Sequence, residues 1–140
     1  MTVIHRFARS DRGQALAEFA LTVPVLLFLV LGIIEFGRAW SQQQAITDAA
    51  REGARLAVVV DPTVTAATVV TRVKSALRRA AVDSTATVTL TGTFRSTGTP
   101  MTVSVSAPYR FVFLAPIVNL FGGAQASLIT LSSAVTMRNE

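Results

Sequence analysis

The sequence predicts an α+β fold, in which a long N-terminal helix that begins in a membrane carries a second helix and a three-stranded antiparallel sheet. Three observations predict it. An apolar block without a charged residue runs from Phe19 to Ile34, an Ala-rich segment continues the helical pattern to Val60, and the last part of the chain alternates polar and apolar residues. We expect a basic leader over residues 1–13, the long helix over 14–60 and a small exported domain over 61–140.

The first residues predict the orientation of the apolar block. Arg6, Arg9 and Arg12 precede it, with Asp11 as the only acidic residue among them. Cationic residues beside a membrane-spanning helix favour the cytoplasmic side. A span over residues of about 17–40 has the length that a bilayer requires. We therefore expect a single pass through the inner membrane, with the N-terminus in the cytoplasm and the C-terminal domain outside.

Composition argues against catalysis and against nucleic-acid binding. The net charge is +5, but the basic residues beyond the leader are spread along the chain rather than gathered in a patch. There is no cysteine, and the one histidine, His5, lies in the leader. From residue 14 onward the chain therefore lacks the usual metal ligands, thiol nucleophiles and commonest general base. We expect no catalytic residue, no metal, no cofactor and no nucleic-acid partner.

A glycine and a glutamate mark the junction between the leader and the helix. Gly13 ends the basic segment, Gln14 follows, and Glu18 stands just before Phe19 and the apolar block. A carboxylate at the start of an apolar helix is costly without a partner, so Glu18 either pairs with another group or lies among the lipid headgroups. This arrangement resembles the class III leader of type IV prepilins and pseudopilins. The resemblance implies that a prepilin peptidase cuts between Gly13 and Gln14, and that Glu18 registers the subunit against the N-terminal amine of a neighbour.

Two residues interrupt the apolar character of the helix. Pro24 lacks a backbone donor and should bend it. Glu35 lies about 26 Å beyond Glu18 along the helix axis, close to the far membrane interface, where Trp40 also fits. Because Arg38 follows within one turn, we expect Glu35 and Arg38 to form an interfacial i, i+3 ion pair.

The outer part of the helix carries a ridge of small residues. Ala49, Gly53 and Ala57 recur every fourth position, which lets another helix or sheet approach closely. That neighbour is either the chain's own domain or another subunit. Two favourable i, i+3 ion pairs lie outside the ridge, Asp48 with Arg51 and Glu52 with Arg55.

The runs RGQALAEFAL and DAAREGARLAV, joined by a helix that carries Glu35 and Phe36, resemble the TadE family of minor pseudopilins from Tad (tight adherence) pilus systems. The resemblance is close from Arg12 to about Val60 and rests on pattern alone beyond it. It implies a pilin-like subunit for assembly of a Tad-type pilus used in adhesion or secretion. The partners it implies are the prepilin peptidase, other pilins and pseudopilins, the inner-membrane assembly platform and the lipid bilayer.

Two other functions fit the same chain. An uncleaved, signal-anchored envelope protein, whose exported domain is a binding module, would need neither Gly13 nor Glu18. A soluble secreted domain would need cleavage after Ile34. Glu35 and Arg38 make a poor signal-peptidase site there.

The exported domain is predicted from a change of period. Asp61-Pro62 should end the long helix, and Pro62 also suits the first position of a new helix capped by Asp61. Apolar residues then recur every three to four positions as far as Ala81, with cationic residues near the end. The period becomes two in three runs, which predict the three strands: residues 85–95, 101–107 and 127–137.

The second strand should close at Pro108 and Tyr109, and an unusually apolar stretch follows over residues 110–123. We expect this stretch to be a short helix or a hydrophobic loop. It has more large apolar side chains than one helix face needs. It therefore either plugs the small core or forms an exposed contact patch.

Overall fold

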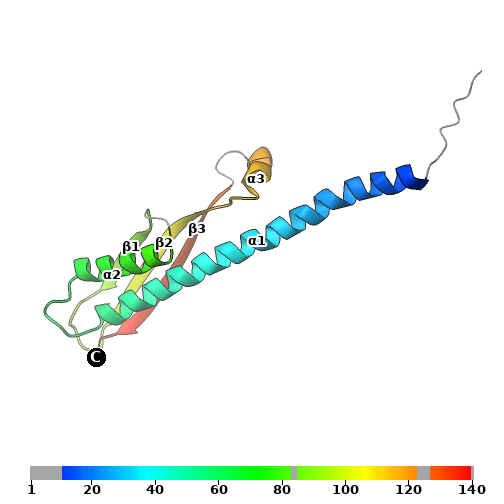
Figure 1. The fold of residues 1–140 in the computed structure, drawn as a ribbon. Helices are drawn as coiled ribbons and strands as arrows, with labels where there is room; N and C mark the ends of the chain where they lie inside the picture. The colour runs from blue at the N-terminus through cyan, green and yellow to red at the C-terminus, as the bar shows by residue number, and fades with distance from the viewer. Residues whose placement is uncertain (1–10, 83–84, 123–126, 140) are drawn as a thin grey trace, which may run out of the picture.

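The structure is a computed structural model that describes residues 11–82, 85–122 and 127–139. The predicted α+β architecture is confirmed: a long N-terminal helix, a second helix and a three-stranded antiparallel sheet (Figure 1). A short third helix lies between the second and third strands. In chain order the elements are α1 (Asp11–Ala57), α2 (Ala66–Arg79), β1 (Thr87–Gly92), β2 (Pro100–Arg110), α3 (Ala115–Gly122) and β3 (Leu128–Arg138).

Helix α1 is the longest element, with 47 residues, and its N-terminal half projects away from the rest of the molecule (Figure 1). It starts at Asp11, inside the expected leader, and ends at Ala57, before the expected end at Val60. The residues that follow, 58–60, are three β-branched valines, which lose side-chain freedom in a helix. Pro24 lies inside α1, and the helix continues through it.

Helix α2 begins with Thr65 as its N-cap rather than Asp61. Thr65 Oγ1 accepts a hydrogen bond from the Thr68 N–H at 3.3 Å. Asp61 instead accepts two bonds of 2.7 Å, from the N–H and the hydroxyl of Thr63. The expectation that Asp61 caps the helix is therefore wrong, because its side chain closes a turn before the helix begins.

The sheet has the strand order β1-β2-β3, with both pairs antiparallel. Strand β1 pairs with β2 only as far as Thr87 opposite Ser106, whereas β3 pairs with β2 along its whole length. The expectation that Pro108 and Tyr109 close β2 is wrong, since the strand continues to Arg110. Beyond Ser106 only β3 borders β2, and a proline is tolerated at such an open edge because no neighbour needs its missing N–H.

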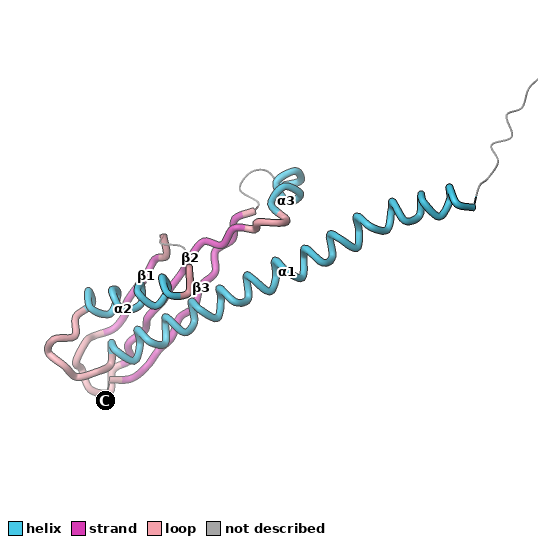
Figure 2. Tube along the Cα trace, viewed as in Figure 1, coloured by secondary structure: helices cyan, strands magenta, loops and turns pink. Residues whose placement is uncertain are grey.

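Helices α1 and α2 lie against one face of the sheet (Figure 2). Alternate side chains of β2 point into the core that results, and the intervening residues form the opposite, polar face. The buried residues of β2 are Met101, Val103, Val105, Ala107 and Tyr109. The helices contribute Ile46, Ala50, Ala54, Val69, Val73 and Leu77.

Helix α3 and the residues before it lie at the end of the sheet that faces the N-terminal half of α1 (Figure 1). This stretch is not a core plug, because Val112 is 52% exposed, Phe113 45% and Leu120 79%. Of the two alternatives, the exposed patch is the one present. Helix α2 ends before it reaches this part of the sheet and so does not cover the stretch (Figure 2).

Candidate functional sites on helix α1

The side chain of Glu35 on α1 forms several hydrogen bonds and an ion pair. Its carboxylate is 1% exposed and accepts hydrogen bonds from the hydroxyl of Tyr109 at 2.5 Å, the N–H of Val112 at 3.0 Å and the N–H of Phe113 at 2.8 Å. Arg38 Nη1 lies 3.1 Å from the same carboxylate. Three of the four donors therefore come from the end of β2 and the segment that leads into α3.

The local fold explains why these donors converge. Tyr109 occupies one of the inward positions of β2, so its ring lies in the core and its hydroxyl reaches α1. The next residues leave the sheet after the Phe111 N–H bonds to the carbonyl oxygen of Ser127 at 2.9 Å. That turn leaves the N–H groups of Val112 and Phe113 without strand partners and aims them at Glu35.

Burial and the carboxylate also change the acidity of the tyrosine. The pKa of Tyr109 is raised to about 12, first by burial of the ring and then by its hydrogen bond to Glu35. The neutral hydroxyl is therefore the form that the folded protein holds. A phenolate at this position would lose its hydrogen bond and face a carboxylate.

The Glu35–Arg38 pair expected from the sequence is present, but the environment of Glu35 differs from the expected one. Arg38 is 45% exposed and its guanidinium also lies over the ring of Phe113, 5.7 Å from the centroid. The carboxylate, by contrast, is covered by protein. The spacing to Arg38 was visible in the sequence, whereas the bonds to Tyr109 and Val112 join residues more than seventy positions apart and leave no local pattern.

The predicted processing site lies at the other end of the uncovered part of α1. Gly13 and Gln14 both belong to the first turns of the helix, and residues 1–10 of the expected leader, with His5, Arg6 and Arg9, lie outside the described residues. Glu18 is exposed, and its carboxylate accepts a hydrogen bond of 2.9 Å from the Gln14 side chain. The Thr22 hydroxyl donates to the Glu18 carbonyl oxygen at 2.8 Å.

The small-residue ridge is covered by the chain's own domain. Ala49 is 2% exposed, Ala57 is fully buried, and Gly53 lies between them. A Cβ added at Gly53 would overlap Cγ2 of Val73 and lie 3.3 Å from Cγ1 of Val103. The glycine therefore lets α1 approach α2 and β2 at once, and the ridge is not free to receive another subunit.

Nearly the whole of α1 is matched by a known family. The family model of TadE-like proteins covers residues 13–55. Over these residues, less than half of the chain, the sequence is similar to TadE-like proteins. No curated protein and no solved structure is significantly similar to the chain.

The TadE-like segment contains each of the sites described above except Ala57, the last residue of the ridge. It stops short of the sheet, so the residues that bind Glu35 from β2 and from the turn before α3 lie outside the match. The family implies a protein associated with Tad pili and is not a family of enzymes. The segment also contains a helix long and apolar enough to cross a membrane, with 6% of its most apolar window buried. Such a helix fits a single membrane span or a signal anchor.

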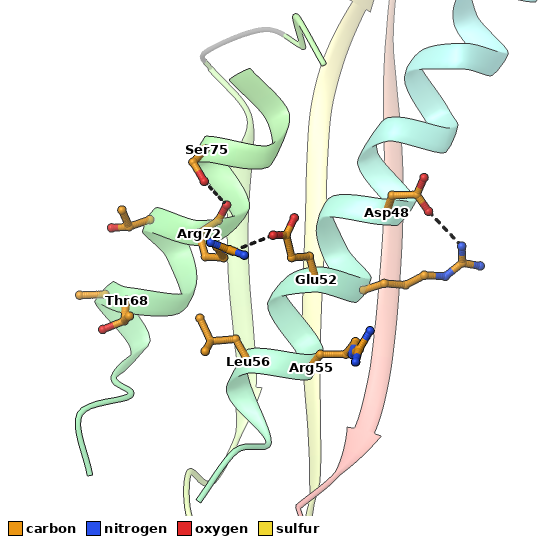
Figure 3. Close-up of a pocket in the computed structure, with 10 residues that line it drawn as sticks. Asp48, Glu52, Arg55, Leu56, Thr68, Arg72 and Ser75 are labelled. Carbon is orange, nitrogen blue, oxygen red and sulfur yellow. Dashed lines mark hydrogen bonds and ion pairs between the residues drawn. The ribbon is translucent and has the colours of Figure 1, made fainter. Parts of the chain in front are cut away.

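An open, charged groove of about 1310 Å³ lies between the TadE-like segment and α2 (Figure 3). Across it, Glu52 pairs with Arg72 Nε at 2.6 Å and with Arg79 Nη2 at 3.3 Å. Asp48 and Arg51 form their expected pair at 3.1 Å. The expected pair of Glu52 with Arg55 is not formed, because Glu52 points toward α2 and Arg55 points away from it (Figure 3). The groove thus contains charges that largely neutralise one another, and we assign it a structural role.

Proposed function

We propose that the protein is a minor pilin or pseudopilin that takes part in assembly of a Tad-type pilus used in adhesion or secretion. The observation that carries this proposal is the TadE-like segment itself, which joins Gly13 and Glu18 to a helix whose apolar side chains are exposed throughout residues 13–30. An uncovered helix of this length needs lipid or other helices around it. A pilin-like subunit uses both in turn, lipid before assembly and neighbouring helices after it.

In this proposal α1 crosses the inner membrane once, with the basic leader in the cytoplasm and the α+β domain outside. A prepilin peptidase removes the leader between Gly13 and Gln14, which leaves Gln14 with a free, positively charged amine. The exposed Glu18 of one subunit then pairs with that amine on its neighbour. In the uncleaved chain the exposed Glu18 carboxylate accepts a hydrogen bond of 2.9 Å from the side chain of Gln14, so it is accessible for this exchange.

The first test is the N-terminal residue of the protein purified from membranes of its native host, measured by intact mass. Prepilin-type processing predicts a chain that starts at Gln14, and a Gly13→Leu variant that stays uncleaved serves as the control. A start at Met1 would remove the pilin mechanism and leave an uncleaved, signal-anchored protein with an exported binding module. A start beyond Ile34 would mean a secreted domain without a membrane helix.

The second test separates assembly from folding. Glu18→Ala should abolish recovery of the protein in sheared pilus fractions while leaving its membrane insertion unchanged. Asp48→Ala is the matched control, since it removes another exposed carboxylate, 70% exposed, from the covered half of the same helix. Equal recovery of the two variants would contradict the registration role of Glu18.

A further inference from the structure

The surface around α3 carries an apolar patch that nothing in the described chain covers. We call it the tip and define it as residues 111–122 together with Leu128 and Ile129. No residue of the stretch 111–122 is charged. The large apolar side chains of the tip that are exposed by more than a third are Val112, Phe113, Ile117, Leu120, Leu128 and Ile129.

The position of the tip along α1 is fixed by Glu35. Because the carboxylate binds the N–H groups of Val112 and Phe113, the tip is held beside the helix turn that contains Glu35. The last exposed apolar residues before Glu35 are Ile33 and Ile34, and Ile34 is 44% exposed. If α1 spans a bilayer up to this point, the tip lies at the level where the outer leaflet meets water.

The residues at this level have the chemistry of a membrane interface. Phe36 and Trp40 are exposed and stack on one another at 6.2 Å between ring centroids, and aromatic residues favour the headgroup region. Arg38 and Arg110 flank the tip, and both are exposed, so they suit lipid phosphates. An almost wholly apolar groove of about 430 Å³ lies between α1 and the tip, with Trp40 and Leu114 among its walls.

We propose that the tip docks into the outer-leaflet interface of the bilayer, with Glu35 holding it at that depth. The occupant of the apolar groove is then a lipid acyl chain, and Arg38 meets the phosphate above it. A second copy of the chain fits less well, because the exposed apolar side chains of the tip lie at the level of the membrane boundary while the outer face of the sheet beyond them is polar. The inference rests on the proposed membrane insertion of α1 and is independent of the pilus role.

The chain has no cysteine, so single cysteines can be labelled with the environment-sensitive fluorophore NBD. We would reconstitute the full chain in phosphatidylethanolamine–phosphatidylglycerol vesicles that contain lipids spin-labelled at the headgroup or deep in the acyl chain. The three sites are Leu120→Cys on the tip, Leu26→Cys in the uncovered part of α1 and Thr89→Cys on the polar face of the sheet. We expect strong shallow quenching at 120, strong deep quenching at 26 and none at 89.

The outcomes separate the two proposals. Quenching at 26 with none at 120 would overturn docking of the tip and leave membrane insertion standing. No quenching at 26 would overturn insertion, and docking with it. A blue-shifted but unquenched label at 120, with a shift that grows with protein density in the membrane, would replace lipid by a second copy of the chain.

The role of Glu35 has its own readout in the same vesicles. Glu35→Gln should reduce shallow quenching at 120 and leave deep quenching at 26 unchanged, because the amide makes weaker bonds to the two N–H groups. Tyr109→Phe removes one donor without removing the carboxylate and keeps the test meaningful if Glu35→Gln fails to fold. Unchanged quenching at 120 in folded samples of both variants would show that other contacts set the depth.

Discussion

The two halves of helix α1 differ in whether the rest of the chain covers their apolar side chains. Both halves are rich in apolar residues, but residues 13–30 are exposed throughout, whereas Ile46, Ala50 and Ala54 are fully buried. The covered half faces the sheet and α2, and its small residues allow that close approach. The uncovered half has large side chains and no partner among the residues that the structure describes. One continuous helix therefore joins a segment that needs an outside partner to a segment that already has one.

The same contrast separates the two carboxylates at the ends of the uncovered half. Glu35 has four partners, three of them from distant parts of the chain, and is buried. Glu18 is exposed, and its carboxylate bonds to a side chain one turn away. Glu35 thus fastens the domain to the helix within one molecule, and Glu18 is the carboxylate that remains available to another.

The largest effect on stability is expected when each of the two carboxylates is removed in turn. Glu35→Ala should lower the free energy of unfolding by about 1–3 kcal/mol, because it leaves the buried Tyr109 hydroxyl and the part-buried N–H groups of Val112 and Phe113 without their acceptor. Glu18→Ala should change it by no more than about 0.5 kcal/mol, as for other exposed positions. Urea unfolding followed by circular dichroism in detergent micelles measures both. Equal effects of the two substitutions would remove the distinction.

The tyrosine that binds Glu35 offers a second test, by pH. Its pKa in the folded protein is about 12, against about 10 in an unfolded chain. Since the folded pKa is the higher one, the stabilisation is complete below pH 10 and is lost as pH rises from 10 to 12. The loss should reach about 2–3 kcal/mol, at 1.36 kcal/mol for each pKa unit.

This titration can be followed directly, because Tyr109 is the only tyrosine of the chain. Phenolate absorbance at 295 nm should rise with a midpoint near 12 in the folded protein and near 10 in urea. A Tyr109→Phe variant has no such signal and provides the baseline. A midpoint near 10 in the folded protein would mean that the hydroxyl is not buried against Glu35.

The third test compares two glycines of α1. Gly53→Val should destabilise the domain by about 1–3 kcal/mol, because even a Cβ at this position overlaps Val73. Gly37→Val is the matched control, since a Cβ there meets nothing within 4 Å. The same urea titration compares the two. A control as unstable as Gly53→Val would indicate that the cost does not come from packing against α2, and helix propensity would not explain it, because valine is a better helix former than glycine.

Most of the fold could be predicted because it follows from local periodicity. The uninterrupted apolar block predicted α1, and the helical spacing of Val69, Val73 and Leu77 predicted α2. The alternation of polar and apolar residues predicted the strands. The predictions that failed have two different causes. Asp61 does not cap α2 because its side chain closes a local turn with Thr63, two residues along the chain. Strand β2 runs past Pro108 because β1 no longer borders it there, which depends on the pairing of distant strands.

The candidate sites divide in the same way. Gly13, Glu18 and Arg38 were predicted from their spacing within one helix, and all three lie within the residues that the family model covers. The donors to Glu35 from Tyr109 and beyond could not be found, since nothing near Glu35 in the sequence encodes them. The exposure of the apolar stretch before and within α3 could not be predicted either. Amino-acid composition does not show whether α2 extends far enough to cover that part of the sheet.

The smallest expected effect concerns the ion pair that joins the covered half of α1 to α2. Arg72→Met should cost no more than about 1 kcal/mol, because Arg72 is 58% exposed and its partner Glu52 32%. Lys74→Met, an exposed charge on the same helix, is the control, and the difference between them should shrink in 1 M salt. Such a small, salt-sensitive cost would mean that apolar packing, rather than charge, holds the covered half of α1 against the domain. A larger cost that salt does not reduce would mean that water is excluded from the groove between α1 and α2, as it would be if another subunit covered it.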